Sequence, residues 1–277
     1  MRPVFLILHY GSHKVTETCI ESILNMDYSC DYTILIADND AGPSSWDLYK
    51  DNPRIRVIST GNTGFSAANN AAYSYARENL DPDMIIACNN DLVFNQDGFG
   101  EDKLELLLGT DAYAVGPDIE KISTGEHQSP IATKLPDIKA AKRTLFLNKF
   151  LLAFYPVLYL HFRTLVRGKT QLGVSVTGTE DIIVPFGACI IFTRRFIEKE
   201  DKLFTPETRF YYEEFILAKR FKDKGYKIFY EPSLHVLHED GAASKASFKA
   251  DYLRLKRKVQ NTRDACEVYL RYIEQGK

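Results

Sequence analysis

Short apolar runs alternate with amphipathic segments along the first part of the chain. Four runs are too short for helices and are typical of buried strands, namely residues 4–8, 33–37, 55–58 and 84–88. Apolar residues at helical spacing follow Ser12, and a second helix is expected from about residue 66 to residue 80. This alternation predicts an α/β fold with a mostly parallel sheet flanked by helices.

Three of these runs end in polar turns, which contain residues 9–12, 38–40 and 89–91. The carboxyl ends of parallel strands share one edge, where open α/β sheets bind ligands, so the turns are expected to form one site. A carboxylate such as Asp91 could hold a hard divalent cation, which takes oxygen ligands and leaves positions open for substrate phosphates. The alternative is an ordinary polar turn, in which Asn and Asp are common.

A glycine-rich stretch at residues 61–64 follows the third run, but it matches neither of the common phosphate-binding loops. A kinase-like NTPase and a Rossmann dehydrogenase are therefore poor interpretations. Asp38 could bind a ribose or a base, as acidic residues at strand ends do in nucleotide-binding folds. It could equally serve as a turn or cap residue.

The composition is that of a folded protein, with 45% hydrophobic residues, 26% charged residues and a formal net charge of −2. This balance lacks the basic excess of nucleic-acid binders, so no nucleic-acid partner is expected. The five cysteines are scattered without a C-x-x-C pair, which favours a reducing compartment over a disulfide framework or a structural zinc. The apolar run at the N-terminus is too short for a signal peptide and is expected to be the first strand.

Residues 137–172 differ in character from the rest of the chain. Residues 144–159 are apolar nearly all round, yet fall short of the ~20 apolar residues of a spanning helix. The flanks carry only basic charges: Lys139, Lys142, Arg143, Arg163, Arg167 and Lys169. This pattern favours a helix lying in an anionic membrane surface. The alternatives are a helical hairpin packed on the sheet and an oligomer contact, such as a homodimer.

The later part of the chain returns to the alternating pattern. Residues 182–193 are expected to form a strand, with Gly187 where a backbone can approach a ligand closely. Residues 210–215 are expected to open a helix that reaches residue 224, and the helix dipole alone would also favour the two glutamates in its first turn. A strand at residues 227–230 and an amphipathic helix at residues 248–273 complete the pattern.

The order of the motifs carries more information than any one of them. The motifs lie at residues 37–40, 62–65, 69–70, 89–91, 186–188, 211–214, 220, 225–227, 230–232, 238, 241 and 244. In this order they resemble the family 2 glycosyltransferases with the Rossmann-like GT-A fold, in particular rhamnosyltransferase-like enzymes of bacterial surface-polysaccharide and capsule assembly. The resemblance covers roughly residues 3–120 and 182–245.

The resemblance implies a division of the chain into parts. Residues 1–245 would form the GT-A domain, with a nucleotide-binding half at 1–120 and a catalytic and acceptor half at 182–245. Residues 137–172 would be a helical, apolar and basic insertion, and residues 246–277 a C-terminal helix. The enzyme would be cytoplasmic and peripheral on the inner face of the plasma membrane, through contacts at Lys142, Arg143, Phe150, Phe154, Arg163 and Arg167.

The resemblance also implies a substrate class and a cofactor. The donor would be a UDP- or dTDP-sugar, the cation Mg²⁺ or Mn²⁺, and the acceptor an oligosaccharide or lipid-linked glycan, with inversion at the anomeric carbon. Asp91 matches the metal-binding aspartate of the D-x-D motif, although Asn89 replaces the other aspartate, and His238 matches a late histidine near the metal. The residues expected to bind the nucleotide sugar are Tyr10, Asp38, Asn62, Gly64, Asn69, Asn89, Asn90 and Gly187.

The Glu213-Glu214 pair matches the family's acidic pair, whose second member is the catalytic base. Glu214 would accept the proton of the acceptor hydroxyl, and Glu213 remains a rival. Ile216 stands where the family often has another acid. The alternative function is a non-catalytic GT-A-fold subunit of a membrane polysaccharide-assembly complex, for which Asn89 and Ile216 are the evidence. A sugar nucleotidylyltransferase fits less well, because the first strand lacks a glycine-rich phosphate loop after it.

Overall fold

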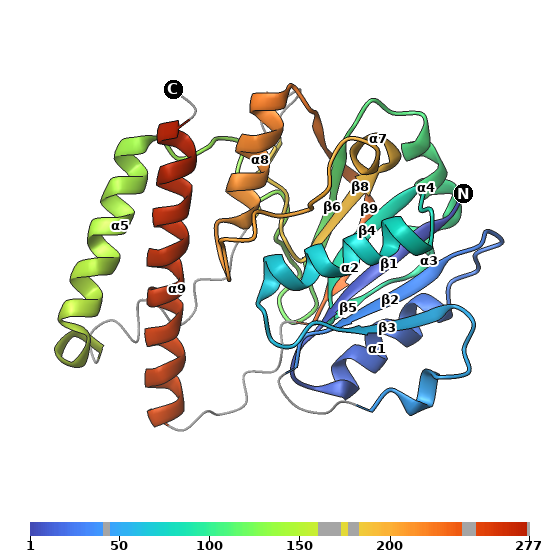
Figure 1. Cartoon of the computed structure of the whole chain (residues 1–277), viewed down its shortest axis with the longest axis horizontal. Coiled ribbons are helices and arrows are strands. Elements are labelled where there is room, and N and C mark those ends of the chain that lie inside the picture. Colours follow the sequence, from blue (N-terminus) through green and yellow to red (C-terminus); the bar gives the residue numbers. More distant parts are fainter. Residues whose placement is uncertain (41–44, 160–172, 177–182, 240–247, 276–277) are drawn as a thin grey trace.

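The computed structural model describes residues 1–40, 45–159, 173–176, 183–239 and 248–275. The described chain has an α/β architecture in which helices flank one mixed sheet (Figure 1). The strands are β1 (Pro3–His9), β2 (Thr33–Asp38), β3 (Ile55–Ser59), β4 (Met84–Asn89), β5 (Leu92–Val93), β6 (Ala114–Lys121), β7 (Glu126–His127), β8 (Cys189–Thr193) and β9 (Ile228–His238). The helices are α1 (His13–Leu24), η1 (Asp47–Tyr49), α2 (Phe65–Asn79), α3 (Gln96–Phe99), α4 (Glu101–Leu108), α5 (Ile138–Ala153), α7 (Arg194–Ile197), α8 (Glu213–Lys224) and α9 (Phe248–Gln275).

The strand order is β3-β2-β1-β4-β8-β6-β9-β5, and β7 pairs with β6 outside this path. The pairs β1–β2, β2–β3 and β1–β4 are parallel, so the predicted parallel half of the sheet is confirmed. Strand β8 then enters antiparallel to both β4 and β6. The sheet is therefore mixed, and strands from the N-terminal part of the chain form its parallel half.

Two predicted strand boundaries were wrong. Strand β9 continues well past Tyr230 to His238, and it includes Pro232, a residue that strand interiors rarely contain. Strand β9 pairs with β6, and the register of this pairing shifts between Pro117 and Asp118 of β6. This irregularity accommodates Pro232 within a continuous β9 strand. Strand β8 is shorter than predicted, because Val184 forms only an isolated bridge with Ala132 before the chain turns at residues 186–188.

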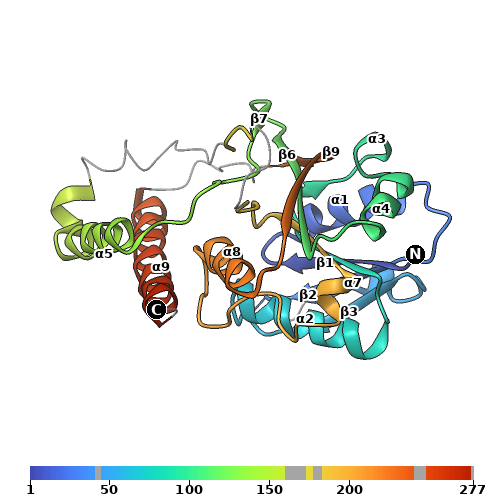
Figure 2. The ribbon, with the colours of Figure 1, turned by 90° about the horizontal axis from the view of Figure 1, so that it is seen from above.

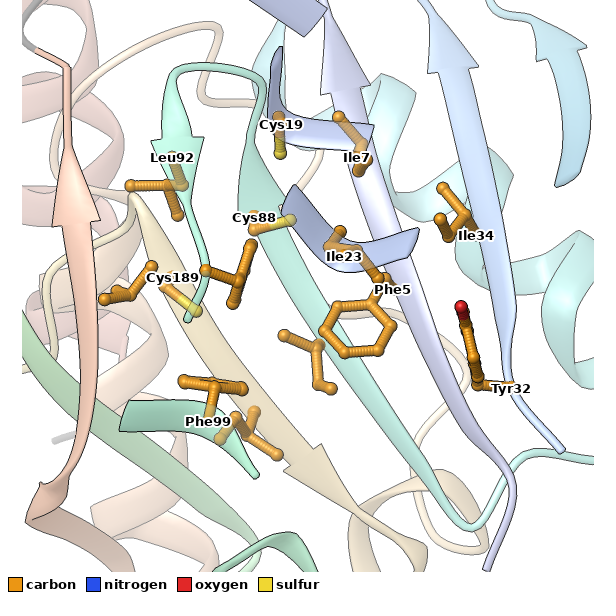
Figure 3. Packing of buried hydrophobic residues seen from close by; sticks show 14 of the residues in the cluster. Phe5, Ile7, Cys19, Ile23, Tyr32, Ile34, Cys88, Leu92, Phe99 and Cys189 are labelled. Carbon is orange, nitrogen blue, oxygen red and sulfur yellow. The ribbon is translucent and has the colours of Figure 1, made fainter. Parts of the chain in front are cut away.

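Each face of the sheet is covered by a separate apolar cluster. Helices α1, α3 and α4 lie over one face and α2 lies over the other (Figure 2). On the first face, Phe5, Cys19, Cys88 and Cys189 come together from β1, α1, β4 and β8 (Figure 3). Cys88 and Cys189 are buried free thiols and pack there as small hydrophobic residues.

Helices α5 and α9 pack side by side, away from the sheet, with α8 between α9 and the strands (Figure 1). Tyr269 of α9 is fully buried in the apolar cluster that joins α9 to α5 and α8. The insertion is therefore helical in its described part, and the predicted C-terminal helix is confirmed. Helix α5 packs on helix α9 rather than on the sheet. Among the described segments, no helix combines the length and apolar character that crossing a bilayer requires.

Candidate active site

The carboxyl ends of β1, β2 and β4 meet at one edge of the sheet, as predicted. The register of the parallel pairs places His9 beside Asp38 and Leu8 beside Asn89. Hydrogen bonds connect the turns that follow. The Asn90 side-chain amide donates to Thr16 Oγ1 at 2.8 Å, and His9 Nδ1 lies 2.6 Å from the same oxygen. The edge is thus one connected polar site built from distant segments.

The turn after β1 contributes an exposed aromatic ring and a buried imidazole. Tyr10 is exposed, and its carbonyl accepts a hydrogen bond from the Asn90 side chain at 3.3 Å. The neighbouring His9 is fully buried, and this burial lowers the pKa of its imidazole. The Gly11 backbone N–H donates to Asp40 Oδ1 at 3.1 Å, which ties the β1 turn to the β2 turn.

Asp38 lies at the end of β2 and is 8% exposed. Its Oδ2 accepts a hydrogen bond from Trp46 Nε1–H at 2.9 Å, and its Oδ1 accepts one from the Asp40 backbone N–H at 3.2 Å. The Trp46 ring stands edge-on to His9, with 4.8 Å between ring centroids, and lies 4.6 Å from His13. Trp46 was not predicted as a site residue, because it lies eight residues beyond Asp38 in the connection from β2 to β3 and no local pattern marks the contact.

The glycine-rich turn contacts a residue from the second half of the chain. Asn62 and Gly64 both have positive φ, at 53° and 93°. A Cβ on Gly64 would stand 2.7 Å from the Cγ of Arg209, so the glycine is required by close approach as well as by conformation. The Arg209 guanidinium reaches Asn62 Oδ1 at 3.4 Å. Arg209 was not predicted, and only the folded chain brings it to this turn.

Asn69 is buried in α2. It is 1% exposed, and its side-chain amide donates to the Phe65 carbonyl one turn earlier in the helix. These contacts serve the packing of the helix, and the role of Asn69 in nucleotide binding stays a prediction. Asn89, in contrast, lies at the edge itself, and its backbone N–H donates to the Ala188 carbonyl at 2.9 Å.

Asp91 and His238 lie together, as a metal-binding pair would. The antiparallel pairing of β5 with β9 sets Leu92 against His238, and His238 Nε2 lies 3.3 Å from Asp91 Oδ2. Asp91 Oδ1 is buried without a hydrogen-bond partner among the described residues, so it is an acceptor available to a cation. The described residues include no group of three or more acidic, His or Cys side chains that could hold a metal ion.

Gln128 orients the imidazole of His238. Its Oε1 lies 2.7 Å from His238 Nδ1, which leaves Nε2 directed to Asp91. Groups that bond the other ring nitrogen of a histidine in this way commonly fix the orientation of a metal ligand. Gln128 was not predicted as a site residue, because it follows β7 in a segment without a recognisable motif.

The acidic pair opens α8 from a strained turn. Tyr211 and Tyr212, which precede the helix, have positive φ of 73° and 62°, a conformation that is uncommon for bulky residues. Glu213 is 7% exposed, and its Oε2 has no hydrogen-bond partner in the described part of the chain. Burial, followed by the neighbouring Glu214, raises the pKa of Glu213 to about 8. Burial also raises the pKa of Glu214.

Gly187 lies directly against Glu214. Its backbone N–H donates to Glu214 Oε1 at 3.3 Å, and a Cβ on Gly187 would stand 2.5 Å from that oxygen. The two residues on either side complete the connection, because the Phe186 ring lies 5.9 Å from the His238 ring and Ala188 bonds Asn89. The loop of residues 186–188 therefore joins the acidic pair to the Asp91–His238 pair.

The insertion presents apolar side chains to solvent. Phe150 and Phe154 on α5 are 47% and 51% exposed, with their rings 4.9 Å apart. Arg143 of α5 is also exposed, whereas Lys142 forms an ion pair with Glu274 of α9 at 2.9 Å. Arg163 and Arg167 lie outside the described residues. The basic charge of this segment is thus partly balanced by an acidic residue of α9. The sequence of the insertion alone did not indicate this pairing.

Comparisons with known proteins agree with this fold. The chain is 27% identical over 130 residues to a chondroitin synthase of Pasteurella multocida (strain Pm70), which covers 42% of this chain and 13% of the synthase. It thus spans a small part of that relative's length. The mannosyltransferase PcManGT from Pyrobaculum calidifontis, solved with GDP-Man and Mn²⁺, is 12% identical over 97% of this chain and 69% of its own, with a TM-score of 0.53.

S. aureus TarS 1-349, solved with UDP-GlcNAc, gives a similar result. It is 10% identical over 95% of this chain and 66% of its own, with a TM-score of 0.52. At these identities the two structures show a shared GT-A fold and no more. The model of the family described as Glycosyl transferase family 2 matches residues 5–166, more than half of the chain. The chain therefore belongs to glycosyl transferase family 2.

Proposed function

We propose that the chain transfers a sugar, with inversion, from a nucleoside-diphosphate donor to a hydroxyl group of a glycan acceptor. One observation carries the proposal. Residues 186–188 contact Glu214, His238 and Asn89, so the proposed carboxylate base and the proposed cation-binding pair both adjoin one short loop. An inverting transfer needs these two groups on opposite sides of the reacting carbon.

The donor would lie along the carboxyl edge of the sheet. Its nucleotide would contact Tyr10, Asp38 and the turn at Asn62, and its diphosphate would lie near Asp91. The solved relatives carry UDP-GlcNAc in one case and GDP-Man in the other. For this chain we propose a UDP- or dTDP-sugar, with residues 1–120 serving the nucleotide and residues 182–245 the acceptor.

Asp91 and His238 would hold the divalent cation. The buried Asp91 Oδ1, which has no hydrogen-bond partner among the residues that the structure describes, fits a hard cation such as Mg²⁺ or Mn²⁺, and His238 Nε2 adds a nitrogen donor beside it. The bound cation would neutralise the negative charge of the departing diphosphate. Asn89 can contribute only an amide oxygen, so Asp91 would carry most of the binding.

Glu214 would act as the base. It is half-buried and so accessible to an acceptor, whereas Glu213 is buried at the start of the helix. The raised pKa of Glu214 suits a group that must accept a proton near neutral pH. The Gly187 N–H bonds Oε1 and so fixes the carboxylate, which leaves its other oxygen to meet the acceptor hydroxyl.

We also propose that the acceptor is a lipid-linked glycan of surface-polysaccharide synthesis, met at the inner face of the plasma membrane. The exposed α5 side chains Phe146, Phe150 and Phe154 support this, because apolar rings on a helix with basic neighbours suit an anionic interface. Arg143 is exposed on the same helix. A homodimer that covers these rings is the competing arrangement.

A non-catalytic subunit is the second candidate. It is favoured by Asn89 in place of an aspartate and by the two-residue cation site in the described chain. A panel of nucleotide sugars, incubated with the chain and Mn²⁺, separates the two functions. The enzyme releases the nucleoside diphosphate from one donor, with an acceptor or slowly with water. A chain that binds donors but never turns them over is the subunit.

A further inference from the structure

The carboxylate expected to bind the nucleotide base is already occupied. Both Asp38 oxygens accept hydrogen bonds, and these include one from the Asp40 backbone to Oδ1 and one from the Trp46 indole to Oδ2. With 8% of its surface exposed, Asp38 has little room for a further donor. A base that enters this position must therefore take over an existing hydrogen bond.

Trp46 is the partner that a base can replace. The Asp40 N–H is a backbone group two residues from Asp38, so the turn itself fixes that bond. The indole belongs to a side chain, is half-buried, and also contacts the rings of His9 and His13 at the margin of the apolar cluster on this face of the sheet. Its N–H is a donor in a flat aromatic ring, which is the same arrangement as the ring N–H of uracil or thymine.

We infer that the Trp46 indole occupies the position of the nucleotide base in the donor-free chain, and that donor binding displaces the indole from Asp38. The inference rests on the proposed function and deepens it, because it names the feature of the donor that Asp38 reads. A base with a ring N–H, such as uracil, thymine or guanine, can replace the indole in kind. Adenine and cytosine have no ring N–H at neutral pH.

Trp46 is the sole tryptophan of the chain, so its emission reports the displacement directly. We expect UDP with Mn²⁺ to shift the emission to the red and to increase quenching by acrylamide, as the indole leaves its hydrogen bond. Calorimetry measures UDP binding independently in the same samples. Saturable binding of UDP without any change in emission would overturn the displacement and leave the proposed function intact. Failure of UDP, dTDP and GDP to bind at all would overturn both.

A variant tests the competition. Trp46→Phe keeps a ring against His9 and removes the N–H, so UDP should bind about tenfold more tightly, the scale of one hydrogen bond to a charged group. The control is Leu48→Ala, an exposed neighbour on η1, which should leave the affinity unchanged. Weaker or equal UDP binding by a folded Trp46→Phe chain would show that Trp46 supports the site and is not displaced from it. ADP, whose base has no ring N–H, should bind Trp46→Phe no more tightly than it binds the native chain.

Discussion

His238 Nε2 lies 3.3 Å from Asp91 Oδ2, and a single strand pairing brings them together. Asp91 stands in the tight turn between β4 and β5, and His238 ends β9, which pairs with β5 through Leu92. The Glu239 backbone N–H also donates to the Asp91 carbonyl at 2.8 Å, so the backbone fixes the approach of the two chain segments. The proposed cation-binding pair is thus positioned by strand pairing within the sheet.

The first prediction concerns the base. Glu214→Gln keeps the shape and the hydrogen bond from Gly187 but removes the basicity, so the rate of transfer should fall by about two to four decades. Affinity for the nucleoside diphosphate should stay the same, as calorimetry would show. Glu213→Gln is the matched variant on the adjacent residue and should retain most of the rate. The opposite order of the two variants would assign the base to Glu213.

The second prediction tests the contact that positions this base. Gly187→Ala places a Cβ 2.5 Å from Glu214 Oε1 and must push the carboxylate away, which should lower kcat by about a hundredfold. Gly187 does not have a positive φ, so the backbone tolerates alanine. In Gly109→Ala, the control, the nearest atom is 3.8 Å away and activity should be unchanged. Equal kcat values for the two variants would show that Gly187 does not position the Glu214 carboxylate.

The third prediction follows from the raised pKa of Glu213, about 8 in the folded chain against 4.5 ordinarily. Between these values the folded chain binds a proton that the unfolded chain has lost, so stability falls as pH rises through this window. Glu213→Gln mimics the protonated group and should remove that loss, raising Tm relative to the native sequence at pH 8.5 more than at pH 4.5. The exposed Glu78→Gln controls for loss of a surface carboxylate. Tm curves for Glu213→Gln that run parallel to the native curve would contradict the assignment.

The fourth prediction concerns the exposed face of α5. The chain should bind vesicles of anionic lipid at low salt and be released as salt rises, because each basic residue near the surface contributes about 1 kcal/mol. Phe150→Ser combined with Phe154→Ser should weaken binding, whereas Leu106→Ser, at a still more exposed apolar residue on α4, should not. A dimer in sedimentation, indifferent to lipid and disrupted by the double variant, would instead assign this face to a second copy.

Much of the parallel half of the sheet could be predicted because its signals are local. Apolar runs of four or five residues, each closed by polar residues, predicted β1, β2, β3 and β4 and the edge they share. Asp91 could be singled out for the same reason, as could the two glutamates that open α8. Their assignment to a donor site came from the order of the motifs, which a local pattern does not provide.

The contacts that complete the site depend on pairings over long distances. The length of β9 was missed because Pro232 predicts a strand end, and only the register shift against β6 allows the strand to reach His238. The Arg209 approach to Gly64 and the Gln128 contact with His238 join segments with no shared pattern. The pairing of Lys142 with Glu274 likewise arises from helix packing, which a charge count over the insertion cannot show.

The most direct test of the proposed function is the rate of nucleoside-diphosphate release from the preferred donor, measured with Mn²⁺ for the native chain and for Asp91→Ala. We expect release by the native chain, loss of release in excess EDTA, and no release by Asp91→Ala at an unchanged Tm. Asp97→Ala, an exposed aspartate at the start of α3, should match the native rate. Undiminished release by Asp91→Ala, or by the native chain in EDTA, would contradict a cation-dependent transfer at this edge of the sheet.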